Sequence, residues 1–135
     1  MNESKHEITK IFDKNISYTY DYLSLLGELK PNDDKKIKAL HYSFSATVLK
    51  TVSAIDALTF SISTKIQHAD KENNFELVDS YSKLFELCIE YRKLLENLLS
   101  ENEDEIKYIN TETPRKIKRN VDTFTRKIIM LKSCL

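Results

Sequence analysis

Apolar residues recur along most of this chain at alternating steps of four and three. The clearest run keeps this spacing over eight positions: Ile37, His41, Phe44, Val48, Thr51, Ile55, Leu58 and Ile62. Such spacing places one side chain per turn on a single face of a helix. The 135 residues include one glycine and two prolines, fewer than the turns of a β-rich fold usually need. Together these features predict an all-α protein.

Three other segments have the same periodicity, so we expect helices at about residues 4–28, 33–66, 71–104 and 114–133. Their expected seams are Ile8, Phe12, Ile16, Thr19, Leu23 and Leu26; Leu77, Tyr81, Leu84, Cys88, Tyr91, Leu95 and Leu98; and Ile117, Val121, Phe124, Ile128 and Leu131. The turns between them are short, which favours antiparallel neighbours. The prediction is a single domain over 1–135, folded as an up-down-up-down four-helix bundle.

Local signals mark where these helices should begin and end. Ser4 and Glu7 have the spacing of a capping box at the start of the first helix. Gly27 and Pro31 should end that helix, and the Asn-Asp-Asp segment 32–34 should cap the second. Thr113 is the expected cap of the last helix, with Pro114 in its first turn.

Charges balance at 21 acidic and 21 basic residues, but they are segregated along the chain. Residues 70–105 are strongly acidic, and residues 113–135 are strongly basic. In the last expected helix, Arg115, Arg119 and Arg126 share a line opposite the apolar seam, flanked by Lys116 and Lys127. These five residues are the candidate nucleic-acid-binding set. The same face could instead meet an acidic helix of another subunit, or simply be solvated.

The segment 43–64 is rich in small residues and poor in charge, which is unusual for an exposed helix. Beyond the main seam it has a second stripe formed by Leu49, Val52 and Phe60, with Asp56 among them. Small residues at 46, 53, 57 and 64 run beside this stripe. We expect a homo-oligomer interface there; the alternative is that this helix is the most buried one of a monomer. Asp56, if buried, needs a Lys, Arg or Tyr partner.

No catalytic or metal-binding signature stands out, so we expect a non-enzymatic protein without a cofactor. All arginines follow the three histidines, which excludes the Arg-then-His motif of HEPN-type ribonucleases. Only Glu3 and His6 match the Glu-x-x-His spacing of di-iron bundles, where two such pairs are required. The weakest alternative is an enzyme that uses Asp56, His41 and tyrosines in a cavity of the bundle.

Cysteine usage and hydropathy bear on the compartment. Cys88 lies on a seam, as an inert core thiol would, and Cys134 is expected to be exposed; two cysteines make no disulfide framework. The N-terminal residues have no apolar signal-peptide core. The longest uncharged run, residues 39–49, is too short to cross a membrane. We therefore expect a soluble cytoplasmic protein.

The layout resembles the four-helix-bundle proteins encoded in ribosomal RNA intervening sequences and their relatives, the accessory variability determinants of diversity-generating retroelements. The resemblance covers about residues 20–133. It is carried by the segments "KLFELCIEYRKLLENLLS" (83–100) and "IKRNVDTFTRKIIMLKS" (117–133), with a "YIN" turn at 108–110 between them. It implies a ring-shaped homopentamer without enzymatic activity that binds nucleic acid and a partner reverse transcriptase.

These observations favour an oligomeric accessory or interaction protein whose last helix binds nucleic acid. The alternative is a module of the antitoxin, immunity or phage-inhibitor kind, which would neutralise a basic protein through the acidic third helix. Its candidate residues are Glu86, Glu90, Glu96 and Glu101.

Overall fold

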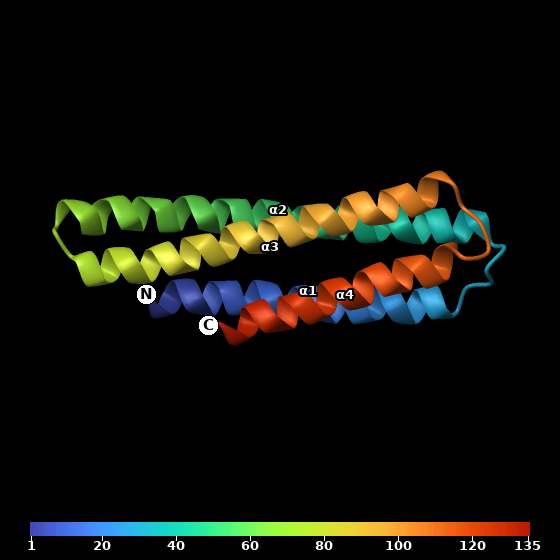
Figure 1. Ribbon diagram of the computed structural model, residues 1–135, viewed down its shortest axis with the longest axis horizontal. Helices are drawn as coiled ribbons and strands as arrows, with labels where there is room; N and C mark the ends of the chain where they lie inside the picture. Colours follow the sequence, from blue (N-terminus) through green and yellow to red (C-terminus); the bar gives the residue numbers. More distant parts are fainter.

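The computed structural model describes residues 1–135, which form four helices joined by short turns. The helices are α1 (Asn2–Gly27), α2 (Asp34–Lys71), α3 (Phe75–Lys107) and α4 (Thr113–Ser133). Consecutive helices run in opposite directions (Figure 1). Each helix packs on two neighbours, so that α1 and α3 both contact α2 and α4. The prediction of an all-α, up-down-up-down four-helix bundle is confirmed.

One apolar core runs between the four helices. All eight positions predicted for the seam of α2 are buried. The predicted seams of α3 and α4 are buried as well, except that Leu77 and Leu131, near helix ends, are only half-buried. Four-three spacing therefore identified the core-facing side of three helices, because the helices are nearly parallel and bury one side chain per turn.

The seam of α1 differs from the prediction over its second half. Ile16 and Leu23 are half-buried, and Asn15 and Tyr22 take the central positions. The Tyr22 ring stacks on Phe44 of α2 with centroids 4.0 Å apart. The steps from Phe12 to Asn15 and from Thr19 to Tyr22 continue the four-three spacing. Position on the helix therefore decides which residues of α1 face the core, even where a neighbour is more apolar.

Two of the predicted helix caps are wrong. Helix α1 begins at Asn2 without a side-chain cap, so the Ser4–Glu7 capping box does not form. Ser4 instead faces the core, where its hydroxyl accepts a hydrogen bond from Lys65 Nζ at 2.9 Å. Thr113 lies inside the first turn of α4, and its Oγ1 accepts from the backbone N–H of Asn110 at 2.9 Å. The predicted cap of α2 is confirmed at Asp33.

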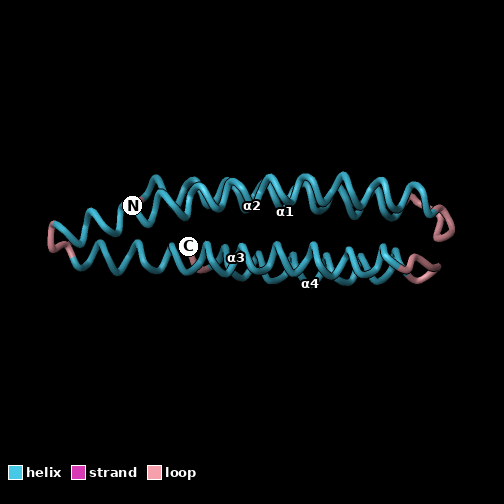
Figure 2. Tube along the Cα trace, turned by 90° about the horizontal axis from the view of Figure 1, so that it is seen from above, coloured by secondary structure: helices cyan, strands magenta, loops and turns pink.

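The turn between α2 and α3 is tighter than expected, because α2 continues to Lys71 and α3 starts at Phe75. Asn73 has φ of 57°, a left-handed conformation that asparagine tolerates better than most residues. The next residue, Asn74, caps α3 by accepting from the backbone N–H of Leu77 at 3.3 Å. As a result, the α2–α3 hairpin extends beyond the N-terminus of α1 and the C-terminus of α4 (Figures 1 and 2).

Candidate functional site

The outer face of α4 has the arginines that the sequence predicted. Arg115, Arg119 and Arg126 are all exposed. Arg115 pairs with Glu112 at 2.9 Å, an exposed contact between residues one turn apart. Arg119 and Arg126 form no ion pair, so their guanidinium groups are free to bind an anion. We refer to Arg115, Arg119 and Arg126 as the arginine face.

The two lysines of the candidate set lie toward the other edge of α4. Lys127 lines a shallow pocket between α3 and α4 together with Glu101, although the two side chains form no ion pair. Lys116 is exposed and lies eleven residues earlier, three turns away on the same side. Both lysines therefore flank the arginine face next to the acidic helix, where Glu101 partly offsets the charge of Lys127.

Sequence reasoning missed a lysine on the opposite edge of the arginine face. Lys118 and Arg115 line a second shallow pocket, formed with Leu23 and Gly27 of α1. Lys118 is exposed and has no ion-pair partner. It lies three residues after Arg115, and this spacing alone could have identified it.

An exposed aromatic residue of α1 lies at the level of the arginine face along the bundle. Lys132 Nζ donates to Asp13 Oδ1 at 2.5 Å, so residue 132 of α4 is level with residue 13 of α1. Tyr20 follows Asp13 by two turns and is 54% exposed, and Arg126 precedes Lys132 by nearly two turns. The Tyr20 ring and the Arg126 guanidinium are therefore at the same level of the bundle. Two nearby tyrosines of α1, Tyr18 and Tyr22, pack against Phe44 of α2 instead.

The candidate oligomer stripe on α2 is only partly exposed. Leu49 and Phe60 project into solvent, with 54% and 76% of their surface exposed. Val52 is 8% exposed and belongs to the core cluster, so its assignment to an open second stripe is corrected. Val52 lies nearer to the main seam than Leu49 or Phe60 does, which accounts for its burial. The small residues at 46, 53, 57 and 64 are exposed, as a close-approach surface would require.

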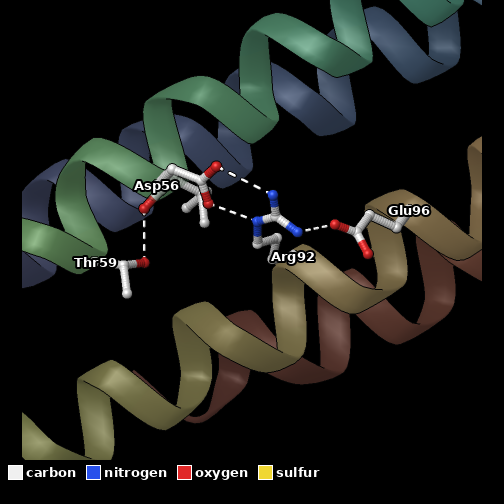
Figure 3. Close-up of polar contacts among 5 residues, drawn as sticks. Asp56, Thr59, Arg92 and Glu96 are labelled. Carbon is white, nitrogen blue, oxygen red and sulfur yellow. Dashed lines mark hydrogen bonds and ion pairs between the residues drawn. The ribbon is translucent and has the colours of Figure 1, made fainter.

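Asp56 has the basic partner that the sequence called for, but the pair is at the surface. Arg92 Nε donates to Asp56 Oδ1 at 2.6 Å, and Arg92 also pairs with Glu96 one turn along α3 (Figure 3). The hydrogen bond that Arg92 donates to the Asp56 carboxylate raises the pKa of Arg92. About half of the Asp56 side chain is exposed, so the expected ion pair forms at the surface and not around a buried carboxylate. Since Glu96 is held in this network, it is not a free acid like Glu86, Glu90 and Glu101.

The polar groups considered for an enzyme do not converge. His41 is 1% exposed; its Nε2 contacts Glu103 Oε2 at 2.8 Å, and its Nδ1 has no partner. Asp56 lies fifteen residues further along the same helix, or roughly 22 Å away. No three His, Cys, Asp or Glu side chains come together as metal ligands would. None of the four helices is long and apolar enough to cross a membrane.

Comparison with known proteins returns no match for this chain, whether against protein-family models, curated proteins or solved structures. We therefore infer the function of the protein from its surfaces.

Proposed function

We propose that this protein is a non-enzymatic accessory module that binds nucleic-acid backbones through the arginine face of α4 and assembles through α2. The observation that carries the proposal is the arginine face itself, where Arg119 and Arg126 are exposed and unpaired. Phosphate oxygens are the natural ligands of such guanidinium groups, which donate several hydrogen bonds from a rigid fork. The family resemblance in the sequence adds a reverse transcriptase as the expected protein partner.

Single-stranded nucleic acid fits this surface better than a duplex does. The exposed Tyr20 ring lies at the level of Arg126, where it can stack on an unpaired base while the arginines hold the backbone. Lys118 extends the positive charge toward α1. Binding of this kind has little sequence preference, because phosphate contacts carry no sequence information.

The test is a triple variant, Arg115→Glu, Arg119→Glu and Arg126→Glu, assayed by fluorescence anisotropy on a labelled single-stranded RNA of random sequence. The parent should bind, and the triple variant should lose binding while keeping its helical circular dichroism. If three phosphates are held, affinity of the parent should fall roughly 20-fold between 50 and 200 mM salt. Equal binding by the parent and the triple variant would refute the proposal.

A matched control separates this surface from net charge. Lys10, Lys38 and Lys93 are exposed, form no ion pair and lie on the other three helices. Changing these three lysines to Glu lowers the formal net charge from 0 to −6, because each change removes one positive and adds one negative charge. The arginine variant has the same net charge. This control should retain most of the RNA affinity. If it loses as much as the arginine variant, binding reflects overall charge and the site assignment is wrong.

A further inference from the structure

Between the C-terminus of α4 and the N-terminus of α1 the bundle has only three helices, because α4 stops early. The Lys132–Asp13 contact places Ser133, the last residue of α4, level with residue 12 of α1, so residues 2–11 of α1 lie beyond the end of α4. The hydrogen bond from Asn120 to Asn102 sets the register on α3. Ser133 lies thirteen residues after Asn120, level with residue 89 of α3 (102 − 13). The segment of α3 before residue 89 therefore also has a free side.

A groove occupies the position that a longer α4 would fill. It lies between the N-terminal part of α1 and the N-terminal half of α3, and the last residues of the chain close one end. Its floor is apolar: Leu84 is buried, and Met1, Leu87 and Leu131 are half-buried. In both views of the fold, the C-terminal end of α4 does not reach as far along the bundle as the N-terminus of α1. The tip of the α2–α3 hairpin lies further out still (Figures 1 and 2).

The groove has a rim of uneven charge. On the α3 side, Glu86 and Glu90 are exposed and form no ion pair. Lys83, which also lines the groove, is already paired with Asp79 at 3.2 Å. On the α1 side, Lys5 is the one charged side chain that lines the groove. The charge still available on the α3 rim is therefore negative.

We propose that this groove is a docking site for an amphipathic helix of a partner protein, about three turns long, with Lys or Arg on the flank that faces Glu86 and Glu90. Residues 2–11 of α1 span roughly 15 Å at ~1.5 Å per residue, close to the length of three helical turns. An apolar floor between two helices accepts side chains at i, i+3, i+4 and i+7 of such a helix. The docked helix runs in the direction of α4, antiparallel to α1 and α3, so it completes the alternation of the bundle.

Charge complementarity favours a basic partner over the α2 surface of a second copy of this chain. Two exposed apolar residues of α2, Leu49 and Phe60, lie on either side of Asp56 along the helix. Docking that surface into the groove would bring the Asp56–Arg92–Glu96 network, whose formal net charge is negative, toward the acidic α3 rim, and like charges in contact oppose association. The site is separate from the arginine face, so this proposal does not depend on nucleic-acid binding.

The groove has a built-in reporter. Cys134 is exposed and lines the groove, while Cys88, the other cysteine, is buried. The probe is a synthetic three-turn helix with leucines at i, i+4 and i+7, lysines on one flank and an N-terminal cysteine. A second peptide has glutamates in place of the lysines. In a glutathione redox buffer, the rate at which each peptide forms a mixed disulfide with Cys134 measures occupancy of the groove.

The lysine peptide should react with Cys134 at least about tenfold faster than the glutamate peptide, a difference of ~1.4 kcal/mol. The double variant Glu86→Lys, Glu90→Lys should reverse this order; both sites are exposed, so the fold should be kept. The reversal also controls for the different intrinsic reactivity of the two peptide thiols. A lysine peptide with its cysteine at the C-terminus should react more slowly, since it would place that cysteine at the far end of the groove.

Three results would overturn the proposal. In the first, the two peptides react equally with the parent protein. In the second, the order is unchanged in the double variant, so the acidic rim takes no part in recognition. In the third, the parent forms dimers that Leu87→Asp abolishes in light scattering, so the occupant is a second copy of the chain. Leu87 is half-buried on the groove floor, and circular dichroism verifies that this variant stays folded.

Discussion

At the scale of single residues, burial changes the titration of several core groups. Burial raises the pKa of the Cys88 thiol to about 11, an effect that a hydrogen bond with Thr59 partly offsets. Burial likewise raises the pKa of Tyr18 to about 12, against hydrogen bonds from Thr51 and Asn15 that lower it. Tyr22 and Tyr91 shift in the same direction, chiefly through burial. In each case the core favours the neutral form, because charge is poorly solvated there.

These shifts predict that the protein loses stability in alkali. When the pKa of a group is higher in the folded than in the unfolded state, the group stabilises the fold fully at pH values below its unfolded pKa. This stabilisation is lost as the pH rises through the folded pKa. For Cys88 that window runs from about pH 9 to about 11, and for Tyr18 from about 10 to about 12. Denaturant unfolding at a series of pH values should show the free energy of unfolding falling above pH 9.

Two variants test which residues cause this loss of stability at high pH. Cys88→Ala should flatten the fall between pH 9 and 10, and Tyr18→Phe should reduce the slope above pH 10, whatever each does to stability at pH 7. A thiol reagent at pH 8 should label Cys134 rapidly and leave Cys88 unlabelled until the protein unfolds. Stability that stays constant up to pH 11 would contradict the assigned burial.

The sequence indicated the burial of Cys88 and the exposure of Cys134, because one lies on a four-three seam and the other lies beyond it. Ser4 lies four residues before Ile8, on the same stripe, but its spacing to Glu7 favoured a helix cap over a core position. Its hydroxyl partner in the core is Lys65, which is far away in sequence and donates across the α1–α2 interface. Similarly, Asp56 could be assigned a basic partner, but not Arg92 in particular, and not an exposed position.

At the scale of the helices, a polar contact joins the two that lie diagonally across the bundle. Tyr91 Oη of α3 donates to Asn15 Oδ1 of α1 at 2.5 Å, and both residues have no exposed surface. The Tyr91 ring also stacks on Phe12, with centroids 4.4 Å apart. A buried polar pair of this kind disfavours other registers, since any shift would leave both groups without partners.

Tyr91→Phe should destabilise the protein by about 1–3 kcal/mol, because it removes the donor and leaves the buried Asn15 oxygen unsatisfied. Asn15→Leu should also destabilise, since it leaves the Tyr91 hydroxyl unpaired. The double variant should cost less than the sum of the two, because neither polar group remains. Urea unfolding of the four proteins measures the coupling. Strict additivity would mean that the hydrogen bond makes no specific contribution.

Helix positions and their antiparallel order were predictable from the sequence, and the register between helices was not. Spacing and turn residues located all four helices and the buried faces of α2, α3 and α4. The central position of Asn15 was missed because Ile16, its neighbour, looked like the better core residue. The buried Asn15 oxygen accepts from the Tyr91 hydroxyl, which lies on a helix distant in sequence, and this partner could not be foreseen from the local pattern. The early end of α4 against α1 also depends on a register contact, Lys132 with Asp13, that no local pattern indicates.

At the scale of the whole molecule, neutrality conceals two charged sides. The arginine face belongs to α4, and the free acids Glu86, Glu90 and Glu101 belong to the adjacent α3. Their separation allows two kinds of partner at once, phosphates on one side and a basic helix on the other. It also allows head-to-tail contact between copies, in which the arginine face of one subunit meets the acidic helix of the next. Assembly and nucleic-acid binding would then compete for the same arginines.

Solution mass, measured by light scattering on a sizing column across salt concentrations, separates these possibilities. We expect a multiple of the chain mass, five-fold if the family resemblance extends to assembly. Leu49→Ser with Phe60→Ser should reduce it to a single chain, because these exposed apolar residues would pack at the interface. Leu25→Ser with Phe75→Ser is the matched control, since those residues are 49% and 66% exposed and lie on other helices.

The arginine-to-glutamate triple variant completes this experiment. If α2 alone forms the interface, the triple variant should keep the parental mass while losing RNA binding. If the arginine face contacts an acidic helix of the next subunit, the triple variant should dissociate, and high salt should dissociate the parent as well. A parent that stays monomeric under all conditions would contradict assembly through α2. The exposed Leu49 and Phe60 would then have to contact a different protein.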